Sequence, residues 1–397
     1  MFAKKTIKDV DVRGKRVLVR VDFNVPLADG SVTDDTRVRA ALPTLRYLVD
    51  HGARVIVMSH LGRPKGEPDP HYSLRPVRRV LQRLLGRNVA FVDDIVGAEA
   101  HEAVARMVDG EVLMLENVRF HPGEKSNDPA FAAELATLAD IYVNDAFGAA
   151  HRAHASTAGI AAKLPAVAGL LLAREVETLS AMLANPDRPF VAILGGSKVS
   201  DKIGVIDRLL ECVDALIVGG GMCFTFLVAK GVSVGDSLVE PEWVEPAKRM
   251  LDKALERGVE LLLPVDFVVS EQIVEDAETM IVGREEIPAG MMGLDIGPTS
   301  VELFKGTISD ARTIFWNGPM GVFEMTPFGT GTREVAMAVA RNNRAASVVG
   351  GGDSVAALKK FDLEERVTFV STGGGASMML LEGSPLPGVE ALADKSA

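Results

Sequence analysis

The chain has 397 residues, of which 47% are hydrophobic and 24% are charged, and its formal net charge is −11. This length is too great for a single hydrophobic core and predicts about two globular domains. The acidic balance argues against nucleic acid as a partner, because binding a phosphate backbone requires a basic face.

Three further features bear on where the protein works. No run approaches the roughly 18 apolar residues of a membrane span, so we expect no membrane association. The N-terminal segment has basic residues but no apolar signal core, which argues against export. Cys212 and Cys223 cannot build a disulfide framework and lack metal-ligand spacing, so we interpret them as ordinary core or helix residues. Together these features predict a cytoplasmic protein.

Short apolar, β-rich runs recur along the first part of the chain and alternate with stretches of helical pattern. The runs are residues 16–23, 54–60, 89–94, 112–120 and 141–147. Continuous apolar runs separated by helices indicate a parallel sheet that is covered on both faces. We therefore predict an α/β domain over residues 1–170.

Polar and basic residues follow these runs, at the edge where open parallel sheets bind their ligands. They are Asp22, Asn24, Arg37, His60, Arg63, Arg119, His151, Arg152 and His154. Arginine suits anion binding because its planar fork pairs with phosphate or carboxylate oxygens in a bidentate manner. A single arginine at the end of a strand more often takes part in a surface ion pair than in ligand binding. His151 and His154 are too few to indicate a metal site. Basic loops after four separate predicted strands of an acidic chain favour one small, highly anionic ligand.

The second part begins after an amphipathic stretch that ends in Asn-Pro-Asp-Arg-Pro, a strong helix stop. The stretch lacks the Gly/Ser enrichment of a flexible linker, so we predict an interdomain helix over residues 171–185. Further apolar runs follow at residues 190–196, 215–221, 260–269, 313–319, 347–354 and 368–375. We predict a second α/β domain over residues 186–380 and a C-terminal tail over residues 381–397.

The stretch GGSKVSDK, which follows the first of these runs, has the composition of an anion site. Gly195 and Gly196 allow backbone N–H groups to approach a ligand closely. Lys198 and Lys202 are four residues apart, which predicts a helix with both lysines on one face. Because the start of a helix favours anions, we expect a phosphate here, although the P-loop pattern is absent from the chain.

Three more glycine runs, at residues 219–221, 350–352 and 373–375, end strands of the second domain. One glycine run is weak evidence for a ligand site, because tight turns need glycine in any case. Four such runs in one domain suggest a nucleotide that lies along the edge of the sheet. Asp353 stands at a predicted helix start and is a plausible ligand of Mg²⁺ held on phosphates. Glu324 could hydrogen-bond ribose hydroxyls, although without its surrounding motif it would be taken as a surface glutamate.

Two other functions compete with phosphate transfer. An NAD-dependent dehydrogenase on Rossmann-like domains is disfavoured because no convincing G-x-G-x-x-G fingerprint follows a first strand. A non-catalytic carbohydrate- or protein-binding module that kept the fold is expected to lose active-site residues. Arg37, Lys202 and Asp353 are all present.

The motifs RVDFNVP, SHLGRP, ENVRFHPGEKSND, YVNDAFGAAHRAHAS, LGGSKVSDKI, WNGPMGVFE, VVGGGDS and STGGGAS occur in that order. In these motifs the chain resembles the phosphoglycerate kinase family from end to end. The resemblance implies two Rossmann-like parallel-sheet domains that face a cleft, a tail that packs back on the first domain, and a monomer. It also implies phosphoryl transfer between 1,3-bisphosphoglycerate and ADP in glycolysis or gluconeogenesis, with hinge-bending closure near residues 170–189.

The resemblance assigns roles residue by residue. The implied contacts to 3-phosphoglycerate are Asp22, Phe23, Asn24, Arg37, His60, Leu61, Gly62, Arg63, Arg119 and Arg152. The implied contacts to Mg²⁺-ATP or Mg²⁺-ADP are Gly196, Lys202, Gly220, Gly293, Asn317, Pro319, Glu324, Gly351, Gly352, Asp353 and Ser354, with Asp353 on the metal. The implied catalytic groups around the transferred phosphoryl are Arg37, Lys198, Lys202, Gly374 and Gly375. Thr368 and Phe369 stand where relatives often have Ser-His, and they touch no catalytic position.

The chemistry of such a transfer agrees with the residues present. The acceptor is a carboxylate, whose pKa of about 4 leaves it ionised at neutral pH, so no general base is required. Catalysis then needs positioning and charge neutralisation of a loose, in-line transfer. Arg37, Lys202, Mg²⁺ and the N-terminal end of the GGGAS helix are the groups expected to provide both.

Overall fold

The computed structural model describes residues 2–395, which divide into two compact units. The first unit contains the residues up to 178 and from 385 onward, and the second contains residues 179–384. The first change of unit falls inside helix α5 (Leu170–Ala184), which covers nearly the same residues as the expected interdomain helix. Residues 1, 396 and 397, which belong to the expected first domain and tail, lie outside the described residues.

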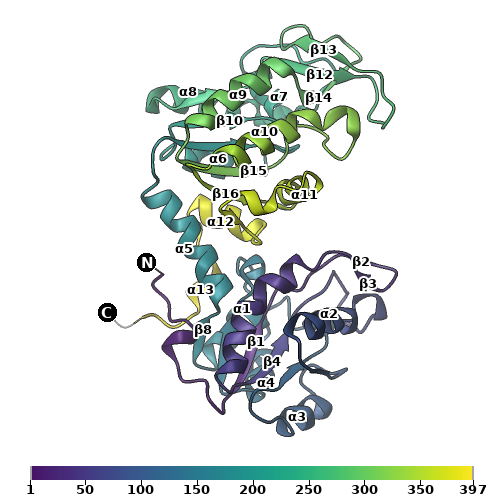
Figure 1. Ribbon diagram of the computed structural model, residues 1–397, viewed down its shortest axis with the longest axis vertical. Helices are drawn as coiled ribbons and strands as arrows, with labels where there is room; N and C mark the ends of the chain where they lie inside the picture. The colour runs from purple at the N-terminus through teal and green to yellow at the C-terminus, as the bar shows by residue number, and fades with distance from the viewer. Residues whose placement is uncertain (1, 396–397) are drawn as a thin grey trace. The chain divides into compact units, whose positions relative to one another are not determined.

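The first unit is built on a six-stranded sheet in the order β5-β6-β4-β1-β7-β8 (Figure 1). Every neighbouring pair is parallel. The strands are β1 (Arg16–Arg20), β4 (Arg54–Met58), β5 (Val89–Phe91), β6 (Val112–Met114), β7 (Ile141–Asn144) and β8 (Ala166–Ala168). The helices are α1 (Thr36–Asp50), α2 (Arg75–Leu85), α3 (Ala98–Ala105) and α4 (Pro129–Thr137).

The second unit repeats this plan with a six-stranded parallel sheet in the order β11-β10-β9-β15-β16-β17. The strands are β9 (Phe190–Leu194), β10 (Ala215–Val218), β11 (Glu260–Leu262), β15 (Thr313–Asn317), β16 (Ala346–Gly350) and β17 (Phe369–Val370). The helices are α6 (Ile203–Leu209), α7 (Met222–Ala229), α8 (Val244–Arg257), α9 (Pro298–Asp310), α10 (Thr330–Arg341), α11 (Gly352–Lys360) and α12 (Gly375–Glu382). The prediction of two parallel-sheet α/β domains is confirmed.

Both sheets are buried on their two faces, as their continuous apolar runs require. Val17 and Leu18 point to opposite faces of β1 and are both fully buried, and the same holds for Phe315 and Trp316 of β15. Each fully buried aliphatic side chain contributes about 1.5–3 kcal/mol, so these strands hold the sheets rigidly and leave only their carboxyl ends for ligands.

One strand prediction is wrong. The run 260–269 was expected as a single strand, but β11 ends at Leu262, before Pro264. Proline has no N–H to donate to a sheet ladder, so the chain leaves the sheet there. β12 (Asp266–Ser270) then forms a separate antiparallel sheet with β13 (Met280–Gly283) and β14 (Met292–Ile296). The analysis of the sequence missed this sheet and the small β2–β3 hairpin (Leu27–Ala28 and Ser31–Val32).

The C-terminal segment belongs to the first unit. It contains α13 (Pro387–Glu390), where the Gly388 N–H donates to the Ala150 carbonyl at 2.9 Å. Further along, the Ala393 N–H donates to Ala166 and the Ala393 carbonyl accepts from Lys5. The tail is therefore joined by backbone hydrogen bonds to β8 and to the N-terminal segment.

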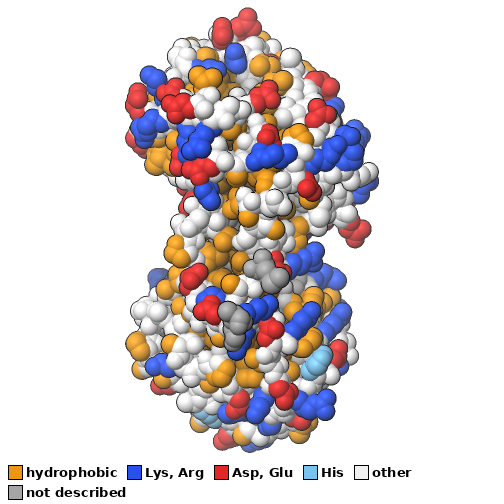
Figure 2. Space-filling model, turned by 90° about the vertical axis from the view of Figure 1, so that its left-hand side faces the viewer, with side chains coloured by type: hydrophobic (Ala, Val, Ile, Leu, Met, Phe, Trp, Pro, Cys, Tyr) orange, Lys and Arg blue, Asp and Glu red, His pale blue; other side chains and the backbone are white. Residues whose placement is uncertain are grey.

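The surface is mixed in charge. On the face drawn in Figure 2, acidic and basic side chains are intermingled, with hydrophobic side chains between them. The positive charge that an anionic ligand needs must therefore be concentrated locally, at the strand ends. Among residues 2–395, no helix is both long and apolar enough to span a membrane.

Candidate functional site

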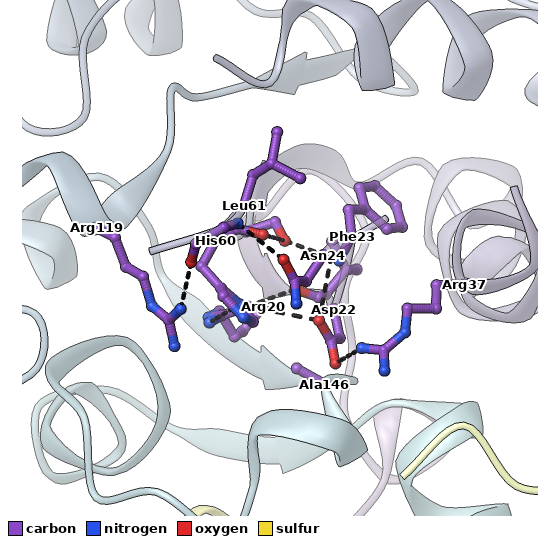
Figure 3. Close-up of polar contacts among 12 residues, drawn as sticks. Arg20, Asp22, Phe23, Asn24, Arg37, His60, Leu61, Arg119 and Ala146 are labelled. Atoms are coloured by element: carbon purple, nitrogen blue, oxygen red, sulfur yellow. Dashed lines mark hydrogen bonds and ion pairs between the residues drawn. The ribbon is translucent and has the colours of Figure 1, made fainter. Parts of the chain in front are cut away.

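The first unit gathers predicted ligand residues at the carboxyl ends of the neighbouring strands β1, β4 and β6 and at the start of α1. Asp22 and Asn24 follow β1, and His60 follows β4. Arg119 lies in the turn after β6, and Arg37 is the second residue of α1. Figure 3 shows Arg37 and Arg119 on opposite sides of a central group formed by Asp22, Asn24 and His60. Residues far apart in the sequence therefore form one basic site.

Hydrogen bonds hold this central group in place before any ligand binds. Arg37 makes an ion pair with Asp22, whose side chain is 9% exposed. The Asn24 Oδ1 accepts the Gly62 N–H at 2.8 Å, and Arg119 Nη1 donates to the Gly62 carbonyl at 2.6 Å (Figure 3). Arg63, by contrast, is exposed.

His60 is a buried, neutral member of the group. Its side chain is 3% exposed, and its Nδ1 lies 3.1 Å from Arg20 Nη2 and 3.9 Å from Asp22 Oδ1. Burial, followed by the positive charges of Arg20 and Arg119, holds the pKa of His60 well below its ordinary value. The ring is therefore neutral near pH 7 and can accept a hydrogen bond from an arginine.

The analysis of the sequence missed a buried network behind this group. Arg20 is fully buried within β1, and its Nε donates to Ser156 Oγ at 2.8 Å. Ser156 Oγ donates to Glu124 Oε1 at 2.7 Å, and His154 Nδ1 lies 3.6 Å from the same oxygen. Burial raises the pKa of Glu124, but the hydrogen bonds of His154 and Ser156 and the charge of Arg20 bring it below its ordinary value. The available signal was an arginine inside the apolar run VLVRVDF.

Positive charge accumulates at this site in excess of what the protein neutralises. Burial, and then the charges of Arg152 and Arg20, lower the pKa of Arg119 to about 10. The buried Arg119 Nε has no hydrogen-bond partner among the described residues, and Arg152 Nε has the neutral His151 Nε2 at 3.1 Å. Arginines that repel one another, one of them with an unpaired N–H, form a ready site for an anion.

The second unit contains a cavity of about 380 Å³. Of the predicted nucleotide residues, those that line it are Gly196, Gly220, Gly293, Pro319, Glu324 and Asp353. Phe224 and Phe267, which sequence analysis did not select, form an aromatic wall with ring centroids 4.8 Å apart. A β-carbon at position 293 would lie 2.3 Å from Phe224 Cζ, so glycine is required for this close approach. The remaining predicted residues lie outside the cavity lining: Lys198, Lys202, Asn317, Gly351, Gly352, Ser354, Gly374 and Gly375.

The two lysines do not share a helix face, so that prediction is wrong. α6 begins only at Ile203, with Lys202 as its N-cap, and Lys198 lies in the preceding loop. The loop is held away from helical geometry because Gly196 donates to the Pro319 carbonyl and Ser200 is bound at both N and Oγ by Glu240.

Lys202 instead points toward the end of β15. Its Nζ hydrogen-bonds Asn317 Oδ1, and Asn317 Nδ2 donates to the Gly350 carbonyl at 2.9 Å. Burial lowers the pKa of Lys202 to about 8, while the charge of Asp353 acts in the opposite direction. The ammonium is thus a partly desolvated cation, which interacts with an anion more strongly than an exposed lysine does.

The donors at the cavity can be tested against the needs of Mg²⁺. Among the described residues, no group of three or more Asp, Glu, His or Cys side chains could hold a metal ion alone. Asp353, in the first turn of α11, supplies one carboxylate at the cavity wall. Mg²⁺ commonly takes one or two carboxylates and completes its shell with substrate phosphates and water, so this site fits a metal that arrives with a nucleotide.

Comparison with known proteins gives one consistent answer. A family model described as phosphoglycerate kinase matches residues 7–384. The phosphoglycerate kinase of Rubrobacter xylanophilus is 59% identical over 392 residues, which cover 99% of both chains. That of Chloroflexus aurantiacus is 58% identical over 396 residues, which cover 98% of this chain and 99% of the relative.

Solved structures agree with the sequence relatives. The phosphoglycerate kinase of Coxiella burnetii superimposes with a TM-score of 0.88 at 43% identity, and that of Pyrococcus horikoshii with 0.84 at 33%. Each comparison covers 98% of both chains. The protein is accordingly an enzyme of the phosphotransferase class, and its chain belongs to the phosphoglycerate kinase family.

Proposed function

We propose that the enzyme transfers a phosphoryl group reversibly between 1,3-bisphosphoglycerate and ADP, giving 3-phosphoglycerate and ATP in glycolysis and gluconeogenesis. The observation that carries this proposal is the arginine site of the first unit, where mutually repelling arginines and the unpaired Arg119 Nε favour a compact anion. An aromatic-walled cavity in the second unit, whose lining includes the carboxylates of Glu324 and Asp353, supplies the complementary site for Mg-nucleotide.

In the first unit, His60, Arg63, Arg119 and Arg152 bind the phosphate of 3-phosphoglycerate that is not transferred. Asp22 and Asn24 bind the glycerate part, while Phe23, Leu61 and Gly62 shape the wall around it. Arg37 lies at the transferring end, where its ion pair with Asp22 holds the guanidinium in position. This division follows the resemblance and is supported by the ion pair of Arg37 with Asp22 and by the hydrogen bonds that join Asn24 and Arg119 to Gly62.

In the second unit, the cavity accepts the base beside Gly293 and Phe224, and the Glu324 carboxylate accepts hydrogen bonds from the ribose hydroxyls. Lys202 and the start of α11, from Gly351 to Ser354, bind the phosphates. Asn317 holds Lys202 in position, and Gly196, Gly220 and Pro319 form the backbone wall. The Asp353 carboxylate would hold Mg²⁺ that arrives with the nucleotide, and the metal would supply neutralisation of phosphate charge.

The transfer itself requires positioning and charge stabilisation. The acceptor carboxylate, with a pKa of about 4, needs no base to remove a proton. Arg37, Lys198 and Lys202 stabilise the oxygens of the moving group, and the free N–H groups at Gly374 and Gly375 do so at the start of α12. A preorganised cation that interacts more strongly in the transition state lowers the barrier directly.

Because the two sites lie in different units, the reaction requires the units to approach and exclude water, with a hinge in or near α5. We expect the enzyme to act as a cytoplasmic monomer, without nucleic acid or membrane. Small-angle scattering should give a smaller radius of gyration with both ligands bound than with neither. An unchanged radius at saturation with both ligands would contradict closure.

A coupled assay of ATP consumption with 3-phosphoglycerate tests the proposed function. We expect turnover that requires 3-phosphoglycerate, ATP and Mg²⁺ together, and none when glycerate without phosphate replaces the substrate. ATP consumption that is independent of 3-phosphoglycerate would contradict the proposal.

A further inference from the structure

The start of α5 is held by side chains from two other elements. The first N–H groups of a helix have no partner within the helix. Here the Leu170 N–H donates to Thr44 Oγ1 at 2.9 Å, and the Leu171 and Leu172 N–H groups donate to Asp145 Oδ1 at 2.9 and 3.3 Å. Three orphan donors of α5 are thus satisfied from outside the helix.

This junction is tight and closed to solvent. Thr44 and Asp145 are both fully buried. A β-carbon at position 169 would lie 2.1 Å from Asp145 Oδ1, so only glycine allows the carboxylate to reach the helix start. The Gly169 N–H also donates to the Asn144 carbonyl at 2.8 Å. α5 therefore cannot change its direction at this end without disturbing Thr44 and Asp145.

The elements that supply these two side chains also supply substrate arginines. α1 carries Arg37 at its second residue and Thr44 about two turns later. Asp145 begins the segment after β7 that carries Arg152, and its N–H donates to the Arg20 carbonyl at 2.8 Å. Ala146, the next residue, is among those drawn with the polar contacts of the site in Figure 3. The arginine site and the start of α5 thus share two supports.

We propose that Thr44 and Asp145 are positioning residues, which couple occupancy of the arginine site by 3-phosphoglycerate to the orientation of α5. An anion that bridges Arg37 and Arg152 fixes α1 and the segment after β7 relative to each other. This in turn fixes the two acceptors that hold the start of α5, and α5 continues into the second unit beyond Thr178. The inference rests on the proposed function, which supplies the identity of the anion.

Hydrogen exchange at the amides of residues 170–172 measures the coupling directly. We expect 3-phosphoglycerate to slow exchange there in the wild-type enzyme, because ligand binding stabilises the locally closed state. The Asp145→Ala variant should lose this response. Asp128→Ala is the matched control, because Asp128 Oδ1 caps α4 through the Ala130 and Phe131 N–H groups without contacting α5.

Steady-state kinetics provides the second readout. Misplacing reacting groups costs turnover, so Asp145→Ala and Thr44→Val should lower kcat by about 10- to 100-fold. Calorimetric Kd values for 3-phosphoglycerate and ADP should change little. Asp145→Asn keeps an oxygen acceptor for Leu171 and should recover most of the turnover. If Asp145→Ala does not fold, Thr44→Val, which preserves side-chain shape, tests the same coupling.

The outcomes separate this inference from the proposed function. Wild-type enzyme that is inactive with 3-phosphoglycerate and ATP would overturn the function, and the coupling with it. Active wild-type enzyme whose folded variants keep both turnover and the exchange response would overturn the coupling alone. Equal losses in Asp128→Ala would also overturn it, since they would show a general effect of removing a helix cap.

Discussion

The two units differ in how they furnish the same edge of their sheets, the edge at the carboxyl ends of the parallel strands. In the first unit, the edge is filled by charged side chains that a buried network around Arg20 and Glu124 orients in advance. In the second, the edge is made largely of glycine backbone and apolar walls, with the carboxylates of Glu324 and Asp353 in the cavity lining and Lys202 outside it. From these similar folds we therefore expect one site that selects its ligand by fixed charge and another that selects by shape.

The largest effect that can test this contrast is at Lys202, a predicted catalytic cation whose pKa is lowered by burial. Lys202→Ala should lower kcat by about 10²–10³, because a preorganised charge acts most strongly on the transition state. Affinities for 3-phosphoglycerate and ADP should change far less. Lys248→Ala removes a lysine from the surface helix α8 and serves as the control.

Steady-state kinetics on both variants decides the point, once circular dichroism has shown that each is folded. A Lys202→Ala enzyme within about threefold of wild-type kcat would mean that Lys202 is only a structural partner of Asn317.

The next effect concerns the charged site alone. Arg119→Ala should weaken 3-phosphoglycerate binding by about 10- to 150-fold, since a charge-assisted hydrogen bond is worth about 1.5–3 kcal/mol. ADP affinity should stay nearly unchanged, because Arg119 belongs to the first unit. Arg63→Ala should follow the same pattern with a smaller loss, as its side chain is exposed and more strongly hydrated. Calorimetric titration measures both ligands, and equal losses for ADP would refute the division of labour.

The reciprocal change tests selection by shape. Gly293→Ala would place a β-carbon 2.3 Å from Phe224 Cζ and force the aromatic wall to move. Overpacking of this kind typically costs about 1–3 kcal/mol, so ADP affinity should fall about tenfold while 3-phosphoglycerate binding is retained. Gly306→Ala, at an open position on α9, is the matched control. Wild-type ADP affinity in Gly293→Ala would show that this wall does not contact the nucleotide.

Sequence reasoning located the edges of both sheets because apolar runs and the residues that end them are local signals. Asp22, His60 and Arg119 follow their strands directly, and parallel strands bring such ends together. The prediction of a helix that contains both Lys198 and Lys202 was wrong because Ser200, between them, is bound by the distant Glu240, and this contact determines the conformation of the loop. Spacing within a sequence cannot report such a contact.

The missed residues teach the same lesson about side chains. Arg20 is a charge within a buried strand, and its meaning depends on Ser156 and Glu124, which are far away in sequence. Phe224 and Phe267 look like ordinary core aromatics, and only the fold places them on the cavity. The residues that orient or enclose the ligand-binding side chains are therefore the part of a site that is hardest to predict from sequence.

A last prediction concerns stability rather than catalysis and compares one buried carboxylate from each unit. Burial raises the pKa of Asp145 and of Asp295 to about 7, against the N–H groups that bind each carboxylate and lower it. These values lie above the unfolded pKa of about 3.9, so between the two values the native state binds more protons. The free energy of unfolding should therefore fall as pH rises from about 4 to about 7, with little further change above that.

Each carboxylate can contribute up to about 1.4 kcal/mol per pH unit to the slope of the free energy of unfolding against pH. Substitution of either aspartate by asparagine should remove the contribution of that residue. Urea unfolding between about pH 5 and about pH 8 measures the slope, with Asp276→Asn as the control for an exposed aspartate. If the slope is unchanged in Asp295→Asn, that carboxylate does not titrate in the folded state. Because Asp145 and Asp295 lie in separate units, the double variant should lose the sum of the two shares. If the double variant loses less of the pH slope than this sum, the unfolding of one unit depends on the buried carboxylate of the other.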